Sequence, residues 1–84
     1  MPDFDLIEYL NARITEYDTI LTYSNLSEHT RKEFEYFKAF AEWFKAVNNN
    51  ASKDEILRLA TVRDTKSTEA NEATNRYMQE HPSP

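Results

Sequence analysis

Glycine and cysteine are absent from the 84-residue sequence, and its three prolines stand at positions 2, 82 and 84. Because glycine supplies the positive backbone angles of tight hairpins and phosphate-binding loops, its absence argues against a β-rich fold and against a Gly-rich nucleotide site. The lack of cysteine excludes disulfides, a thiol nucleophile and thiolate metal ligands. These absences favour an all-α fold.

Long apolar runs and clustered bases are missing as well. No run approaches the length that a membrane span requires, so we expect no membrane partner. Residues 3–24 hold five acids against one base, within a net charge of −5. Since contacts to phosphates need clustered Lys and Arg, we expect no direct binding to nucleic acid. The first five residues are acidic where a signal peptide would be basic, which predicts a cytoplasmic protein.

Aromatic side chains, in contrast, are concentrated in one short segment. More than half of the residues from Phe34 to Phe44 are aromatic. They are Phe34, Tyr36, Phe37, Phe40, Trp43 and Phe44. Because aromatics make the largest individual contributions to cores and interfaces, we expect the rest of the chain to be built around this segment.

Hydrophobic periodicity predicts three helices in a single domain. In the first segment, Ile7, Leu10 and Ile14 begin a series of apolar residues spaced by three or four positions, which makes one apolar stripe along a helix. The expected helices cover residues 5–23, 28–47 and 53–79, within one domain over 1–80 that is followed by a disordered tail, 81–84.

Polar residues mark the beginning of each expected helix. Asp3 and Asp5 stand where carboxylates favour a helix N-terminus. Ser27 is the expected N-cap of the second helix. Ser52 and Glu55 match a capping box, in which the two residues reciprocally satisfy exposed backbone N–H groups at the start of the third helix.

The expected topology is a three-helix, bundle-like arrangement. The short connection over residues 24–27 favours an antiparallel hairpin of the first two helices. The third helix should pack on this hairpin through its first half, because Arg63 and Lys66 then interrupt its apolar stripe. Beyond them, either the helix emerges from the core, or Ala70, Ala73 and Thr74 form a small-residue face that lets another helix approach closely.

The aromatic helix is apolar over half of its circumference. On a 3.6-residue period, Trp43 and Phe34 bound an apolar half-circle, and charged residues fill the other half. A half-circle of large side chains is wider than one neighbouring helix covers, so the helix needs two partners. Because a chain of this length has a limited core, we expect self-association as a dimer.

Residues with catalytic or metal-binding chemistry do not form recognisable motifs. His29 and His81 belong to no HExxH-like pair, and Glu69 and Glu72 lack the Glu-x-x-His pattern of di-metal helical sites. Glu33 projects toward the aromatic half near the helix start, where the helix dipole favours an acid in water. The alternative is an ion pair with a basic residue of a partner, such as Arg63. We therefore expect no enzymatic activity, no cofactor and no metal.

A protein partner remains the expected ligand, although its identity is open. Trp and Tyr at the edge of an apolar surface are frequent interface anchors, and the small residues of the third helix offer a second surface. The candidate interaction residues are Tyr36, Phe40, Trp43, Val47, Arg63, Ala70, Ala73 and Tyr77.

Two functions are consistent with these features. The first is a non-enzymatic protein–protein interaction module, such as a small adaptor, regulator or assembly factor, that acts through a helical surface. The alternative is an acidic inhibitor that occupies the nucleic-acid-binding site of a partner protein through the acids of the first helix.

Overall fold

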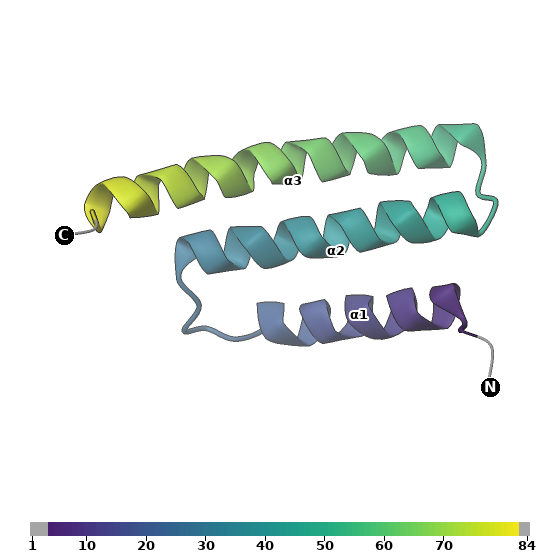
Figure 1. Cartoon of the computed structure of the whole chain (residues 1–84), viewed down its shortest axis with the longest axis horizontal. Helices are drawn as coiled ribbons and strands as arrows, with labels where there is room; N and C mark the ends of the chain where they lie inside the picture. Colours follow the sequence, from purple (N-terminus) through teal and green to yellow (C-terminus); the bar gives the residue numbers. More distant parts are fainter. Residues whose placement is uncertain (1–3, 83–84) are drawn as a thin grey trace.

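The computed structural model describes residues 4–82 and contains three α-helices (Figure 1). They are α1 (Leu6–Leu21), α2 (Glu28–Asn48) and α3 (Lys53–Glu80), each within two residues of the expected ends. No strand occurs in the described part of the chain, which confirms the all-α class. No helix among these residues is long and apolar enough to cross a membrane.

A side-chain oxygen caps the start of each helix. Asp5 accepts a hydrogen bond from the Glu8 amide at 3.1 Å, and Ser27 and Ser52 make the equivalent bonds for α2 and α3. Each bond satisfies one of the amides that have no partner within the helix. The reciprocal half of the expected capping box is absent, because Arg58 binds the Glu55 carboxylate in a bidentate pair. Asp3 lies outside the described residues.

The end of α2 shows how a chain without glycine makes a helix stop. Asn50 has a positive φ of 56°, and the Ala51 amide donates to the Ala46 carbonyl at 3.1 Å. This is the bond of a Schellman motif, in which glycine usually takes the left-handed position. Asparagine tolerates that conformation better than most residues, so the Asn48–Asn50 segment can end the helix.

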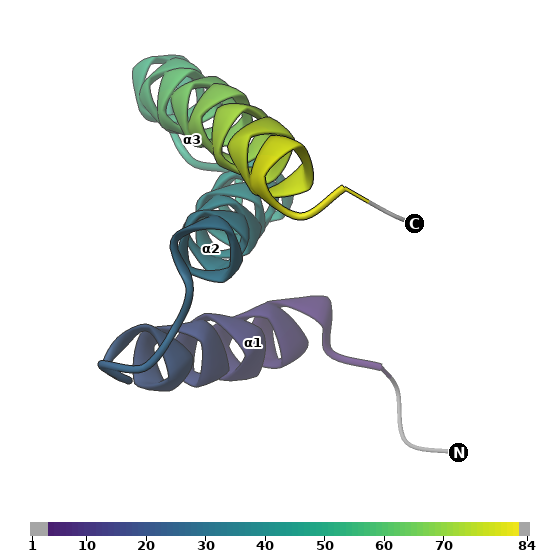
Figure 2. The same ribbon diagram turned by 90° about the vertical axis from the view of Figure 1, so that its left-hand side faces the viewer.

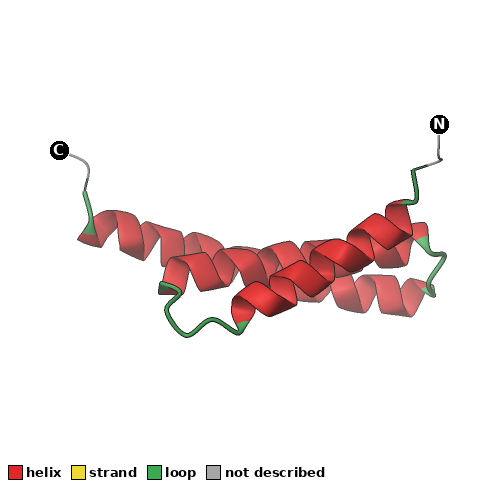
Figure 3. Ribbon diagram, turned by 90° about the horizontal axis from the view of Figure 1, so that it is seen from below, coloured by secondary structure: helices red, strands yellow, loops and turns green. Residues whose placement is uncertain are grey.

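The three helices form a single open layer with α2 in the middle. Viewed along the layer, α1 and α3 lie on opposite sides of α2, which packs against both (Figure 2). Within residues 4–82, the backbones of α1 and α3 do not approach each other closely. Seen from below, α1 crosses the other two helices obliquely (Figure 3). Among the described residues, no helix packs across the two flat sides of the layer. The surface of α2 between α1 and α3 therefore has no neighbouring helix on these sides.

Small side chains make up most of the buried core. Among the described residues, Leu10 and five alanines are buried, and no large side chain is fully enclosed. Ala39 and Ala46 lie on the side of α2 that faces α3, and Ala70 and Ala73 are buried on α3. Alanines at this seam let the two helices approach closely, as small residues do between packed helices.

The packing of α3 against α2 continues to its C-terminal end, so the expectation that it would end near Lys66 is wrong. Arg76 forms an ion pair with Glu28, and the Tyr77 ring lies 4.0 Å from the ring of His29. The His81 amide donates to the Tyr77 carbonyl at 2.9 Å. His81 is thus bonded to the end of α3. Of the expected disordered tail, 81–84, residues 83–84 lie outside the described part of the chain.

Candidate interaction surface

The two sides of the helical layer differ in chemistry. One side, which we call the aromatic face, consists of α2 side chains that lie between α1 and α3. Both neighbouring helices contact the edges of this face, but neither covers its centre at Phe40. The other side, the charged face, carries acids and bases from α2 and α3. The aromatic face comprises Tyr36, Phe37, Phe40, Trp43, Phe44 and Val47. The charged face comprises Lys32, Glu35, Lys38, Glu42, Lys45, Lys66 and Glu69.

Phe40 lies at the centre of the aromatic face. Its ring centroid is 6.2 Å from that of Tyr36, 5.6 Å from Trp43 and 6.1 Å from Phe44. These separations are typical of favourable aromatic pairs. Phe40 nevertheless remains 41% exposed, and Val47 at the end of the face is 39% exposed. The rings thus form a continuous apolar surface in contact with solvent.

An arginine lies over a ring at each border of the aromatic face. On the α3 side, the Arg63 guanidinium is 4.3 Å from the centroid of the Trp43 ring and binds the adjacent Asp64 at 3.0 Å. On the α1 side, Arg13 lies 5.5 Å from the centroid of the Tyr9 ring. Both are cation–π contacts, which keep the arginine stems against apolar surface.

An apolar groove runs between α1 and α2 on the same side of the layer. It encloses about 230 Å³ and is lined almost entirely by apolar and aromatic groups. The lining residues are Tyr9, Leu10, Arg13, Tyr17, Tyr36, Phe37, Phe40 and Ala41. The groove therefore extends the aromatic face toward α1.

The charged face joins α2 and α3 through alternating ion pairs. Lys32 lies 3.5 Å from Glu35 and 3.7 Å from Glu69, while Lys66 lies 3.8 Å from Glu35 and 3.6 Å from Glu69. Lys66 therefore does not end the contact of α3 with α2; it takes part in it. Such a network presents water with balanced charge and little apolar surface.

Ion pairs also neutralise part of the acidic surface of α1. The Lys38 ammonium lies 2.6 Å from the Asp18 carboxylate, and Arg13 lies 2.6 Å from Glu16. The hydrogen bond to Asp18 raises the pKa of Lys38 above its usual 10.5. Two acids that an α1-led mimic of nucleic-acid phosphates would use are thus engaged within the fold.

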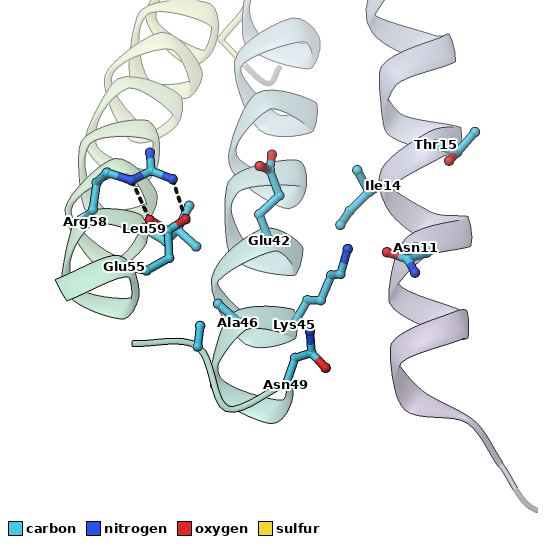
Figure 4. Close-up of a pocket in the computed structure, with 11 residues that line it drawn as sticks. Asn11, Ile14, Thr15, Glu42, Lys45, Ala46, Asn49, Glu55, Arg58 and Leu59 are labelled. Atoms are coloured by element: carbon cyan, nitrogen blue, oxygen red, sulfur yellow. Dashed lines mark hydrogen bonds and ion pairs between the residues drawn. The ribbon is translucent and has the colours of Figure 1, made fainter. Parts of the chain in front are cut away.

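A larger pocket of about 490 Å³ opens on the polar side of the layer (Figure 4). Lys45 and Glu42 of α2 project between Asn11 and Ile14 of α1 and the Glu55–Arg58 pair of α3 (Figure 4). Arg58 lowers the pKa of Glu55 by hydrogen bonding to it. The lining contains no serine, cysteine or histidine, and its two acids are balanced by two bases.

The two histidines, which share no motif in the sequence, lie on either side of one tyrosine ring. Tyr77 lies 4.0 Å from His29 and 4.3 Å from His81, measured between ring centroids. Tyr77 and His81 lie four residues apart at the end of α3, whereas only the antiparallel packing of α2 and α3 brings His29 to them. Within residues 4–82, no group of three or more His, Cys, Asp or Glu side chains is arranged to hold a metal ion.

The structure divides the expected interaction residues among three places. Tyr36, Phe40, Trp43 and Val47 share the aromatic face, and Arg63 borders it. Tyr77 lies apart, at the far end of α3.

Ala70 and Ala73 do not belong to an exposed surface, so their assignment to a partner-binding site needs correction. They are 7% and 3% exposed because α2 covers them. The helix that approaches them closely is part of the same chain. Glu33 is likewise not paired with Arg63 of its own chain; it accepts a 3.5 Å hydrogen bond from Thr74.

The chain matches no protein-family model, and no curated protein or solved structure shows significant similarity to it. The function is therefore argued from the surface itself.

Proposed function

We propose that this protein is a non-enzymatic protein–protein interaction module, a small adaptor, regulator or assembly factor, and that it binds proteins, a second copy of itself included, through the aromatic face. The observation that carries the proposal is the position of this face. It lies on the central helix of an open layer, so that Phe40 remains exposed although other rings pack beside it, and Val47 at the end of the face is exposed too. Contiguous exposed apolar surface of this kind marks interaction sites.

The composition of the face supports the same proposal. Aromatic residues and arginine are enriched in the energetically dominant parts of interfaces, and the face combines Tyr36 and Trp43 with Arg63 at its border. The charged face contains no aromatic residue and no arginine, and four of its lysines and glutamates pair with each other between α2 and α3.

Two valines provide a matched test of which face binds. Val47 on the aromatic face is 39% exposed, and Val62, beside the charged face, is 37% exposed. We expect Val47→Glu to abolish both self-association in sedimentation velocity and capture of partners from an extract of the source organism. Val62→Glu should leave both intact. If the two variants behave alike, the aromatic face is not the binding surface.

Ionic strength separates this proposal from binding led by the acids of α1. Apolar contacts change little between low and high salt, whereas an interaction between exposed charges is screened within about 10 Å at 0.1 M salt. We expect the captured partners to remain bound in 0.5 M NaCl. Release at that concentration would favour the acidic inhibitor instead.

A further inference from the structure

We infer that a second copy of this chain covers the aromatic face, with its α2 antiparallel to the first and the two-fold axis passing beside Phe40. This inference rests on the proposed function, because it names the partner of the same face and the geometry of the contact.

The first argument is the amount of surface left uncovered. The chain exposes 6150 Å², whereas a compact folded monomer of its mass exposes about 5,200 Å². Its radius of gyration is 15.2 Å, against about 12 Å for a compact domain of this length. The excess, roughly 1,000 Å², is about what one partner contributes to a standard protein interface, near 800 Å². A second layer placed on the aromatic face would return the molecule to ordinary compactness.

The second argument is the order of the side chains along α2. A two-fold contact needs a surface that is complementary to itself. Tyr36 and Phe44 each lie four residues from Phe40, and Phe37 and Trp43 each lie three residues from it. If a second α2 runs in the opposite direction with its Phe40 at the same level, each aromatic residue therefore lies at the level of another aromatic residue. An antiparallel copy would place Phe40 beside its own equivalent and rings against rings on both sides.

The third argument is charge. Glu33 and Arg63 both lie on the α3 side of the aromatic face, Glu33 bonded to Thr74 and Arg63 over Trp43. Reversal about Phe40 places Trp43 of the second copy opposite Phe37, one helical turn from Glu33. Arg63 of the second copy then comes within side-chain reach of Glu33, and symmetry creates this pair twice. A parallel arrangement would instead leave Arg63 of each copy at the level of Trp43, about 15 Å along α2 from Glu33.

Cysteine cross-linking tests the geometry directly, because the native sequence has no cysteine to interfere. Glu33 and Val47 lie about 21 Å apart along α2, and each is seven residues from Phe40. In the inferred dimer, residue 33 of one copy faces residue 47 of the other. A short bismaleimide should therefore cross-link a mixture of Glu33→Cys and Val47→Cys proteins but neither protein alone. Val62→Cys, on the other side of the layer, is the control and should cross-link with none of them.

Charge reversal gives an independent readout. Glu33→Arg and Arg63→Glu should each raise the dissociation constant of the dimer roughly tenfold, because two symmetry-related pairs become repulsive. The double variant should regain most of the loss. Circular dichroism establishes that each variant is folded.

Each other result overturns the inference. Cross-linking of each cysteine variant with itself would show a parallel dimer, and a dimer that fails to cross-link would use another surface. A wild-type protein that sediments only as a monomer at 100 µM would exclude the second copy as the occupant. In that case capture of another protein by wild type but not by Val47→Glu would still support the proposed function.

Discussion

Arg31 connects the first two helices through backbone atoms. Its guanidinium, on α2, donates to the carbonyl of Leu21 at 2.8 Å and to that of Tyr23 at 2.6 Å. Carbonyls at the end of a helix have no partner within it, and α1 has no basic residue in its own last turn. A single side chain from the next helix thus adds to the local bonds that Thr22 and Tyr23 make with the last turn of α1.

Replacing this arginine should be costly. Hydrogen bonds to charged groups contribute about 1.5–3 kcal/mol, so we expect Arg31→Met to lower the free energy of unfolding by about 2 kcal/mol. Arg58→Met removes an equal charge from an exposed pair with Glu55 and should have a much smaller effect. Urea denaturation followed by circular dichroism measures both changes. If both variants lose the same free energy of unfolding, the hydrogen bonds from Arg31 to the two carbonyls stabilise the fold no more than an exposed ion pair does.

The ion pair between Lys38 and Asp18 gives a pH-dependent link between α1 and α2. Because the hydrogen bond to Asp18 raises the pKa of Lys38 above its value in the unfolded chain, the folded protein holds this proton more tightly. The resulting stabilisation is fully present below pH 10.5 and is lost as the pH rises through the pKa of the folded state.

A double-mutant cycle of Lys38→Met and Asp18→Asn should therefore give a coupling of about 0.2–1 kcal/mol at pH 8, typical of an exposed pair. The coupling should fall toward zero as the pH is raised above 10.5 and through the pKa of Lys38 in the folded protein. Thermal unfolding of the four proteins across this range provides the measurement. A coupling that stays constant with pH would exclude the titration of Lys38 as its source.

At the scale of the helices, α3 depends on contacts along its whole length. Tyr77 packs on His29 and is 41% exposed, while the neighbouring Met78 is 61% exposed. We expect Tyr77→Ala to destabilise the protein by about 1 kcal/mol and to speed hydrogen exchange in the last turns of α3, because it removes a ring-to-ring contact between helices. Met78→Ala should change little. Unaltered exchange in the Tyr77 variant would show that the end of α3 is held by other contacts.

The alanine seam between α2 and α3 leaves little room for larger side chains. Ala70→Leu should push the helices apart and cost about 1–3 kcal/mol, as overpacked cores do. Ala12→Leu makes the same change at an exposed position of α1 and should be close to neutral. Chemical denaturation compares the two, and a neutral Ala70 variant would mean that the seam is not close-packed.

Local sequence patterns predicted the helices well but their contacts only in part. Apolar spacing and the caps at Ser27 and Ser52 depend on neighbouring residues, and they placed the helix ends within two residues. The course of α3 depends on pairs far apart in sequence, such as Lys66 with Glu35, which no periodicity reveals. For the same reason the sequence pattern presents Lys66 as an interruption of the contact, although its side chain takes part in it.

The sequence predicted how much of the circumference of α2 is apolar, but not which part of it stays exposed. The half-circle of apolar residues on α2 indicated two neighbouring helices, and α1 and α3 are those neighbours. Periodicity alone does not say that they lie on opposite sides, which leaves Phe40 between them and exposed. Ala70 and Ala73 show the opposite case. Their small side chains would suit a helix of another protein, but in this structure α2 of the same chain covers them.

At the scale of the whole molecule, an open layer with few buried side chains should depend on its partner for stability. Six buried residues, of which five are alanine, make a weak core among the residues described. A partner that binds only the folded state stabilises it by mass action. If the partner is a second copy, the stability of the protein must therefore rise with its own concentration.

We expect the melting temperature of the wild-type protein to rise by about 3–5 °C for each tenfold increase in concentration between 1 and 100 µM. A tenfold change in protein concentration alters the free energy of unfolding of a dimer by about 1.4 kcal/mol, or by half of that amount per chain. The melting temperature of a domain of this size changes by about 4–8 °C per kcal/mol. Phe40→Ser should melt at a lower temperature that does not depend on concentration, because it removes the ring at the centre of the aromatic face. Val62→Ser, a change to serine on the other side of the layer, should retain the wild-type dependence. Differential scanning calorimetry decides the matter, since a wild-type melting temperature that is constant over this range would show that the open layer is stable by itself.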